Sequence, residues 1–318
     1  MHPELEKVIT EIEKVIIGKR GVIEKILAAL LAEGHVLLDD VPGVGKTTLA
    51  IALSKAVDLS YRRVQFTPDV LPSDLVGFTV YNKENGTFTY RPGTLNQANL
   101  LLGDEINRAG SKTQSALLEA MEEKQVTVDG DTHLLPTPFF VIATQNSVGA
   151  VGTQLLPYAQ MDRFMVRLSL GYPDYEAQMA MLRSRQSVNP LEQTQCVLAK
   201  AQLLSLIEQV KSVASDDAIL DYITRLTFAS RSHQLVEVGI SPRGALFLDR
   251  MAKAAAWLHN RDYVTGADVQ AVFHDVCSHR VLLKAETGGK TADDVLDELL
   301  KTVEVPDHHI RLGGIRKK

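Results

Sequence analysis

The chain has 318 residues, of which 45% are hydrophobic and 23% are charged, and its formal net charge is −5. This length exceeds the ~100 to 200 residues of a usual domain, so we expect two domains, and no apolar run is long enough to cross a bilayer. The acidic balance disfavours an open surface for the nucleic-acid backbone, and the two distant cysteines, Cys196 and Cys277, favour core thiols over a disulfide framework or a metal site.

Residues 4 to 33 carry apolar residues at helical spacing on both sides of the break IIGKRG, which predicts two helices. The first begins in MHPELEKVITEIEK, a charged amphipathic segment without the apolar core of a secretion signal, so we expect a cytoplasmic protein. A short apolar strand, HVLLD at 35 to 39, then leads directly into PGVGKT and the helical pattern TLAIALSKAV. This order of strand, glycine-rich loop and helix is the context in which phosphate-binding loops occur.

Three further runs predict strands at 61 to 66, 98 to 104 and 138 to 144, and an amphipathic helix is expected at 115 to 124. Strands that alternate with helices indicate a parallel sheet that is covered on both faces. Between the second and third strands, two alternating runs separated by NKENG predict a β-hairpin near 78 to 92.

The strand signals end near Pro173, and the chain beyond it is largely helical, with turn signals at SVNP, SHQLVEVGISP and NRDYVTG. We therefore predict an α/β domain over residues 1–173, which contains the N-terminal helices and the hairpin. A smaller all-α domain is predicted over residues 174–318. The linker between them is short, so the helical domain is expected to hinge on the sheet domain.

The loop from Asp40 to Thr47 contains the groups that phosphate binding requires. Gly43 and Gly45 allow the backbone to approach phosphate oxygens, and Lys46 can reach the β and γ phosphates. The Thr47 hydroxyl can ligate Mg²⁺, and the next helix directs its N-terminus at the anion. One departure is that Asp40 occupies the first position of G-x-x-x-x-G-K-[ST]. The residues expected to bind the nucleotide here are Val41, Pro42, Gly43, Val44, Gly45, Lys46, Thr47 and Thr48.

Polar side chains follow the next two predicted strands. In LLLGDE, Asp104 can hold Mg²⁺ through water, while Glu105, on the other side of the pleat, can polarise an attacking water. In FFVIATQNS, the amide of Asn146 can orient that water against the γ phosphate. Arg163 in YAQMDRFM and Arg243 in GISPRG can supply positive charge to the transition state. Taken singly, each arginine is also compatible with a surface salt bridge.

These blocks, in this order, resemble the MoxR family of the AAA+ superfamily of ATPases. The similar stretches lie between residues 14 and 285 and include HVLLDDVPGVGKT, LLGDEINRAGSKTQSALLEAMEEKQVTVDG, FFVIATQN, LPYAQMDRF, SPR and RDYVT. The resemblance implies a P-loop NTPase fold of the AAA+ type, with a parallel sheet covered by helices and a smaller all-α lid domain.

By the same resemblance, Asp104 and Glu105 take the place of the Walker B acids, and Asn146 takes that of sensor 1. Arg163 corresponds to the arginine finger and Arg243 to sensor 2. These five residues would therefore carry out ATP hydrolysis.

Further properties are implied by the resemblance alone. Ile17 and Gly18 lie in a strip that resembles the lining of the adenine pocket, and the hairpin near 78 to 92 resembles an insert that faces the pore or a partner. The implied cofactors are ATP and Mg²⁺, with the ion held by Thr47 and, through water, by Asp104. The implied assembly is a hexameric ring in which Arg163 acts on the neighbouring subunit's nucleotide.

The implied activity is the remodelling or activation of protein clients, commonly with a von Willebrand factor A domain protein as partner. Two other ATPase functions remain: a nucleic-acid motor or loader, which the acidic balance disfavours, and the motor subunit of a metal chelatase. A scaffold that only binds nucleotide is disfavoured by the intact loop lysine and acid pair.

Overall fold

The computed structural model describes residues 1–84, 86–146, 156–186 and 189–306. At its centre lies a five-stranded sheet with the strand order β2-β5-β8-β1-β9, in which all neighbouring strands are parallel. The sheet strands are β1 (Val36–Asp39), β2 (Tyr61–Gln65), β5 (Leu100–Asp104), β8 (Phe140–Gln145) and β9 (Val166–Leu168).

Successive side chains of these strands enter two different apolar cores, because side chains alternate between the faces of a sheet. Leu38, Leu102 and Ile142 belong to the core that also contains the buried faces of the first three helices. Leu37 and Leu101 belong to the core on the opposite face. Coverage on both faces accounts for the nearly continuous hydrophobic runs of β5 and β8, which are buried at every residue.

Among the described residues of the first part of the chain, six α-helices accompany the sheet. They are α1 (Pro3–Glu13), α2 (Arg20–Leu31), α3 (Lys46–Ala56), α4 (Pro72–Val76), α5 (Ser111–Glu123) and α6 (Tyr158–Met161). Helices α1, α2 and α3 contribute to the first core, and α4 and α5 contribute to the second.

The second part of the chain is mainly helical. Its helices are α7 (Tyr175–Ser184), α8 (Lys200–Lys211), α9 (Asp217–Ser232), α10 (Pro242–Leu258), α11 (Gly266–Cys277) and α12 (Ala292–Thr302). It also contains a short antiparallel pair of strands, β10 (Val236–Val238) and β11 (Leu282–Leu283), which was not expected from the sequence. Among the described residues, no helix combines the length and apolar character needed to cross a membrane.

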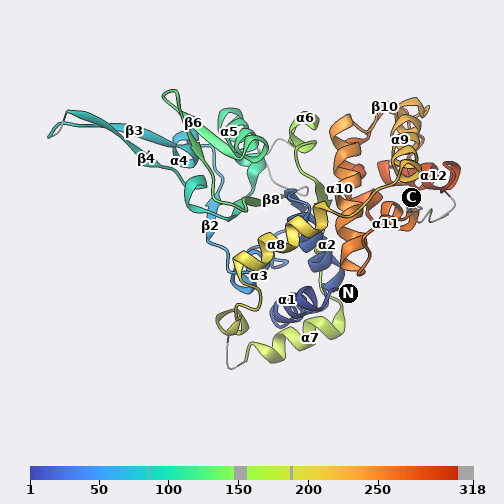
Figure 1. The fold of residues 1–318 in the computed structure, drawn as a ribbon, viewed down its shortest axis with the longest axis horizontal. Helices are drawn as coiled ribbons and strands as arrows, with labels where there is room; N and C mark the ends of the chain where they lie inside the picture. The colour runs from blue at the N-terminus through green and yellow to red at the C-terminus, as the bar shows by residue number, and fades with distance from the viewer. Residues whose placement is uncertain (85, 147–155, 187–188, 307–318) are drawn as a thin grey trace, which may run out of the picture.

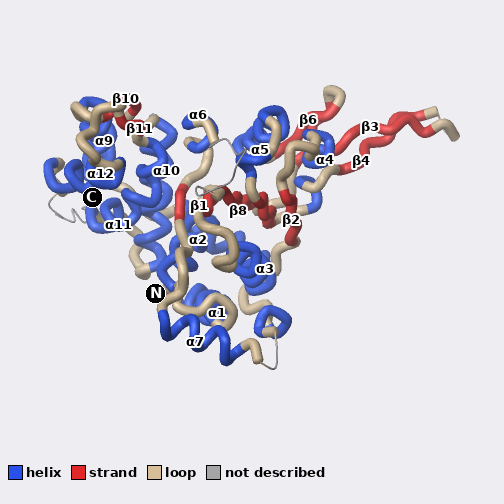
Figure 2. Tube along the Cα trace, turned by 180° about the vertical axis from the view of Figure 1, so that it is seen from behind, coloured by secondary structure: helices blue, strands red, loops and turns tan. Residues whose placement is uncertain are grey.

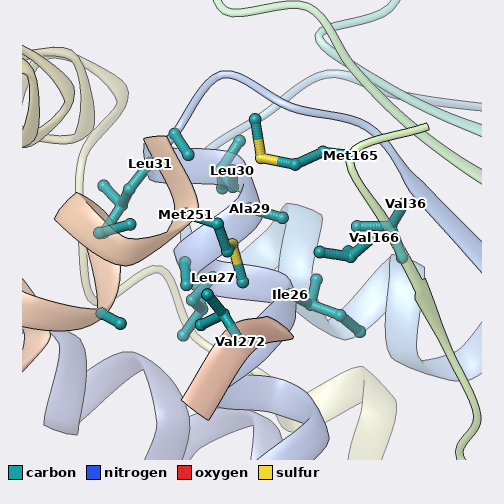
Figure 3. Close-up of a cluster of buried hydrophobic side chains, with 14 of the residues drawn as sticks. Ile26, Leu27, Ala29, Leu30, Leu31, Val36, Met165, Val166, Met251 and Val272 are labelled. Carbon is teal, nitrogen blue, oxygen red and sulfur yellow. The ribbon is translucent and has the colours of Figure 1, made fainter. Parts of the chain in front are cut away.

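Helix α2 joins the two parts through one continuous core. Figure 3 shows Ile26 and Leu30 of α2 between strand residues such as Val166 on one side and Met251 of α10 on the other. Residues from the sheet and from helices α8 to α12 belong to the same buried cluster. The helical part is therefore packed against the sheet part, as Figure 2 shows from behind.

Two β-hairpins extend from the far side of the sheet, opposite the helical part (Figure 1). One pairs β3 (Gly77–Asn82) with β4 (Thr87–Pro92), and the other pairs β6 (Gln125–Val128) with β7 (Asp131–Leu134). The first lies where a hairpin was predicted near 78 to 92, whereas the second was not predicted.

The two cysteines differ in their surroundings. Cys277 is fully buried, as expected of a core thiol, and this burial raises its pKa to about 12. Cys196 is exposed, so its assignment to the core was wrong. It lies just before α8 in an irregular segment, where helical periodicity cannot indicate which side chains face inward.

Candidate functional site

The phosphate-type loop lies between β1 and α3, at the carboxyl edge of the sheet. Gly45 has a φ of 101° and is the N-cap of α3, a conformation that glycine adopts without steric cost. The ammonium of Lys46 folds back over the loop and donates to the carbonyl oxygens of Asp40 at 2.9 Å and Val41 at 3.4 Å. Burial lowers its pKa, while the carboxylates of Asp40 and Asp104 oppose that shift.

The register of the sheet brings the acid pair to this loop. Leu102 of β5 lies opposite Ile142 of β8, so Asp104 and Thr144 meet at the same edge. The Thr144 hydroxyl donates to Asp104 Oδ1 at 2.9 Å, and Thr47 Oγ1 lies 3.4 Å from Asp104 Oδ2. The two residues predicted to hold Mg²⁺ are thus brought together.

Glu105 has a left-handed backbone with a φ of 55°, which is uncommon for a residue with a side chain. Its N–H donates to Thr144 Oγ1 at 2.9 Å, which fixes the backbone in this conformation. Strained conformations of this kind concentrate at functional sites. Asn146 lies between Glu105 and Lys46: its Nδ2 donates to Glu105 Oε1 at 2.8 Å, and its Oδ1 accepts from Lys46 Nζ at 3.1 Å.

Three residues of this cluster were not predicted from the sequence: Arg63, Gln65 and Thr144. Arg63 Nε donates to Asp104 Oδ2 at 2.9 Å, and Gln65 Nε2 donates to Glu105 Oε2 at 3.0 Å. Arg63 and Gln65 are two positions apart on β2, so they share one face of that strand. The available signal was the presence of polar residues at alternate positions of a strand next to the acid pair.

These residues enclose a cavity of about 350 Å³, which is lined by Pro42, Gly43, Gly45, Lys46, Thr47, Thr48, Arg63, Gln65, Asp104, Glu105, Thr144 and Asn146. The residues fit a nucleotide phosphate with Mg²⁺. The backbone and Lys46 supply donors for phosphate, whereas Thr47 and Asp104 supply the oxygen ligands that Mg²⁺ prefers. Within the described residues no group of three or more His, Cys, Asp or Glu forms a metal site, so the ion would depend on phosphate oxygens as well.

The remaining nucleotide candidates surround the same loop. Val41 and Val44 belong to the loop itself, and Ile17 and Gly18 lie in the connection between α1 and α2. Ile16, next to this pair, lies 3.6 Å from the position that a Cβ on Gly45 would take. The predicted adenine strip is therefore adjacent to the phosphate loop.

The structure does not bring Arg163 and Arg243 into this cavity. Both lie beside the C-terminal end of α5, where they share Glu122. Arg163 Nε donates to Glu122 Oε2 at 3.1 Å, and Arg243 donates to Glu122 Oε1. They line a separate cavity of about 300 Å³ together with Arg250 and Lys124. Each arginine side chain is 33% exposed, so both are accessible from outside the subunit.

A buried network holds these two arginines beside each other. Asp162, which precedes Arg163, accepts from Ser241 Oγ at 2.9 Å and from Arg280 Nε at 2.8 Å. Ser241 also caps α10, because its Oγ accepts from the N–H of Gly244 at 2.9 Å. Asp162 therefore ties the end of α6 to the start of α10, the two elements that carry the arginines.

Two family models match the chain. Residues 35–166 match a family described as ATPase family associated with various cellular activities (AAA), and residues 228–299 match an AAA lid domain. The first match contains the loop, the acid pair, Asn146 and Arg163, and the second contains Arg243.

Similar proteins align over nearly the whole chain. The uncharacterised Bacillus subtilis protein YeaC is 46% identical over 308 residues, which cover 96% of each chain. The Mycobacterium tuberculosis chaperone MoxR1 is 39% identical, and the alignment covers 95% of this chain and 82% of MoxR1. A crystal structure of an inferred ATPase from Cytophaga hutchinsonii has a TM-score of 0.87 at 38% identity and covers 96% of this chain and 95% of its own.

Proposed function

Because this chain belongs to the MoxR family of AAA+ ATPases, we propose that it hydrolyses ATP between the subunits of a ring and uses the cycle to remodel or activate protein clients. The observation that carries the proposal is that the expected catalytic groups are divided between two separate cavities of one subunit. Lys46, Thr47, Asp104, Glu105 and Asn146 converge on one cavity, while both arginines lie outside it.

Within one subunit, the loop residues are proposed to bind ATP, and the acid pair Asp104 and Glu105 is proposed to hold Mg²⁺ and to activate the attacking water. The proposed residues for ATP are Val41 to Thr48 with Ile17 and Gly18. ATP with Mg²⁺ supplies the γ phosphoryl group and the cation that neutralises its charge. Lys46 would donate to the phosphate, and the ion would be held by Thr47 and, through water, by Asp104. Glu105 accepts a proton from the attacking water, and Asn146 keeps the Glu105 carboxylate in position.

The second half of the site is proposed to come from a neighbouring subunit. Phosphoryl transfer needs positive charge on the γ phosphate, and an arginine provides it without deprotonation. Arg163 and Arg243 are partly exposed and share Glu122, and Arg243 also lies 3.7 Å from Asp162 Oδ2, so an approaching nucleotide can compete with these carboxylates for the two arginines. A closed ring, with six subunits as the expected number, would place each pair against the next subunit's cavity.

The output of the cycle is proposed to be mechanical and to take place in the cytoplasm. The relative orientation of a sheet unit over residues 1–173 and a helical lid over residues 174–318 would change when the bound nucleotide changes. The name of the relative MoxR1 includes the word chaperone, which supports a protein client. A protein with a von Willebrand factor A domain is the proposed partner.

The proposal is tested by separating nucleotide binding from hydrolysis. Glu105→Gln is expected to retain ATP affinity and to lower turnover by about a hundredfold or more, because the amide cannot accept the proton. Lys46→Ala is expected to lose binding. Binding of a fluorescent ATP analogue and phosphate release are measured on the same preparations. Equal turnover by Glu105→Gln and wild type would sink the assignment of Glu105.

A further inference from the structure

Asp40 occupies the position where the phosphate-loop signature has glycine, and its side chain is turned away from the loop's cavity. Its carboxylate is buried and accepts three hydrogen bonds from one short segment. Ser169 Oγ donates to Oδ1 at 2.7 Å, the N–H of Leu170 donates to Oδ2 at 2.6 Å, and the N–H of Gly171 donates to Oδ1 at 3.0 Å. Two consecutive N–H groups and a hydroxyl thus depend on this carboxylate.

The backbone of Asp40 contacts the loop lysine. Its carbonyl oxygen accepts from Lys46 Nζ at 2.9 Å, and its N–H donates to the carbonyl of Gln145 in β8 at 3.3 Å. One residue therefore touches the ammonium expected to bind phosphate and, through its side chain, the chain that follows β9. If Lys46 moves away from this carbonyl, Asp40 loses its backbone contact with the ammonium.

The segment from Ser169 to Tyr172 leads directly into α7 and the helical part of the chain. It is held a second time by Lys19, whose Nζ donates to the carbonyl of Tyr172 at 2.7 Å. Gly18 lies close to Ala177 in the first turn of α7, since a Cβ on Gly18 would come within 2.9 Å of the Ala177 Cβ. The connection to the helical part is thus clamped between the phosphate loop and the strip expected to line the adenine pocket.

We infer that Asp40 is a positioning residue that couples the phosphate loop to the segment Ser169–Tyr172, and through it passes the nucleotide state to α7. The inference rests on the proposed role of the loop in binding ATP. It explains why an acidic residue replaces the signature glycine: glycine would leave the hydroxyl of Ser169, the buried N–H of Leu170 and the partly buried N–H of Gly171 without their acceptor. It assigns Asp40 no contact with the nucleotide.

The sharpest test is Asp40→Gly, because it completes the sequence signature and is nevertheless expected to impair the enzyme. Asp40→Asn keeps the shape of the side chain but places an NH₂ group, which cannot accept a hydrogen bond, against the donors of Ser169, Leu170 and Gly171. We expect both variants to keep KM within about threefold of wild type and to lower kcat about tenfold. Ser169→Ala removes one of the three contacts without altering the loop, and a smaller decrease in kcat is expected.

Hydrogen exchange provides a readout that a loss of stability alone would not produce. In wild type, the amides of Leu170 and Gly171 should be protected, and ADP with Mg²⁺ should change exchange across α7. In Asp40→Gly these two amides should exchange quickly, and the response of α7 to ADP should be lost although ADP still binds. Asp58→Asn makes the same change of charge at an exposed position and should behave as wild type.

The outcomes separate this inference from the proposed function. Wild type that binds no nucleotide would overturn the proposed function and this inference with it. The inference alone would be overturned by a different result. In that case wild type binds ADP, and Asp40→Gly and Ser169→Ala both match wild type in kcat and in the hydrogen exchange of α7. Should Asp40→Gly fail to fold, Asp40→Asn and Ser169→Ala decide the question by the same measurements.

Discussion

His35 shows how one buried side chain can join two elements without carrying charge. It lies at the entrance to β1, where its Nε2 donates to the carbonyl of Met121 at 3.0 Å and its Nδ1 accepts from the N–H of Val141 at 3.1 Å. This pattern requires the neutral ring. Burial lowers the pKa of His35 to about 4, so the protonated form is disfavoured in the folded protein.

The shift predicts a loss of stability in mild acid. Because the pKa in the folded state lies below the unfolded value of 6.5, the stabilising contribution is complete above pH 6.5 and is lost as the pH falls to about 4. The loss amounts to about 3 kcal/mol of unfolding free energy.

His35→Gln provides the matched comparison, because an amide can accept from Val141 and donate to Met121 without titrating. The difference in unfolding free energy between wild type and His35→Gln is measured by urea denaturation from pH 7 to pH 4. Burial also lowers the pKa of His279, but that residue titrates in both proteins and cancels in the difference. A difference that stays constant with pH would contradict the assignment of His35.

The residues of the site differ in how well the sequence predicts them. Lys46 and Thr47 are identified by a contiguous motif, and their chemistry follows from spacing within one loop. Arg63 is different, because its contact with Asp104 depends on the pairing of β2 with β5 across 41 positions of sequence. A single sequence does not state which strands are neighbours. Asp40 was recognised as a departure from the motif, but its partners at 169–171 became visible only in the fold.

At the scale of elements, α6, α10 and the short 3₁₀ turn Ser278–Arg280 meet around one buried ion pair. Arg280 is fully buried and donates to Asp162 Oδ1 at 2.8 Å and to the carbonyl of Asp162 at 2.9 Å. Burial lowers the pKa of the Arg280 guanidinium, and the Asp162 carboxylate opposes that shift. The pair fixes the elements that carry Arg163 and Arg243.

Arg280→Met is expected to lower the unfolding free energy by about 3 kcal/mol, because Asp162 would lose its fully buried charge partner and keep only Arg243, which lies 3.7 Å from Oδ2. Arg225→Met serves as the control, since Arg225 pairs with an exposed Asp221 on the same helix and should contribute less than about 1 kcal/mol. Urea denaturation of both variants measures the two effects. Equal losses of unfolding free energy in the two variants would show that the buried Arg280 pair stabilises the fold no more than an exposed pair does.

Elements with strong local signals were predicted and short ones were not. The apolar runs of β1, β5 and β8 and the helical periodicity of α5 identified those elements. Strands β9, β10 and β11 have three residues or fewer, too few to establish an alternating pattern. Their pairing depends on neighbours brought together by the fold.

At the scale of the whole molecule, the residues proposed for ATP hydrolysis line two separate cavities of one subunit. The cavity around Lys46 and Glu105 holds the groups proposed for nucleotide binding and water activation, whereas Arg163 and Arg243 line the other cavity. One continuous core through α2 packs the helical part against the sheet part, so buried apolar contacts join the regions that carry the two cavities (Figure 3). The sequence indicated every one of these residues, and the resemblance implied that Arg163 acts on a neighbouring subunit. That Arg163 and Arg243 share Glu122 became visible only in the fold.

The most direct test of a site shared between subunits is ATP turnover by a mixture of Arg163→Ala and Glu105→Gln after subunit exchange. Each variant alone should turn over ATP about a hundredfold or more slowly than wild type. In random mixed rings, about a quarter of the interfaces would combine an intact Glu105 with an intact Arg163, so activity should recover toward about a quarter of the wild-type rate. A mixture no more active than either variant, or wild-type turnover by Arg163→Ala alone, would contradict the shared site.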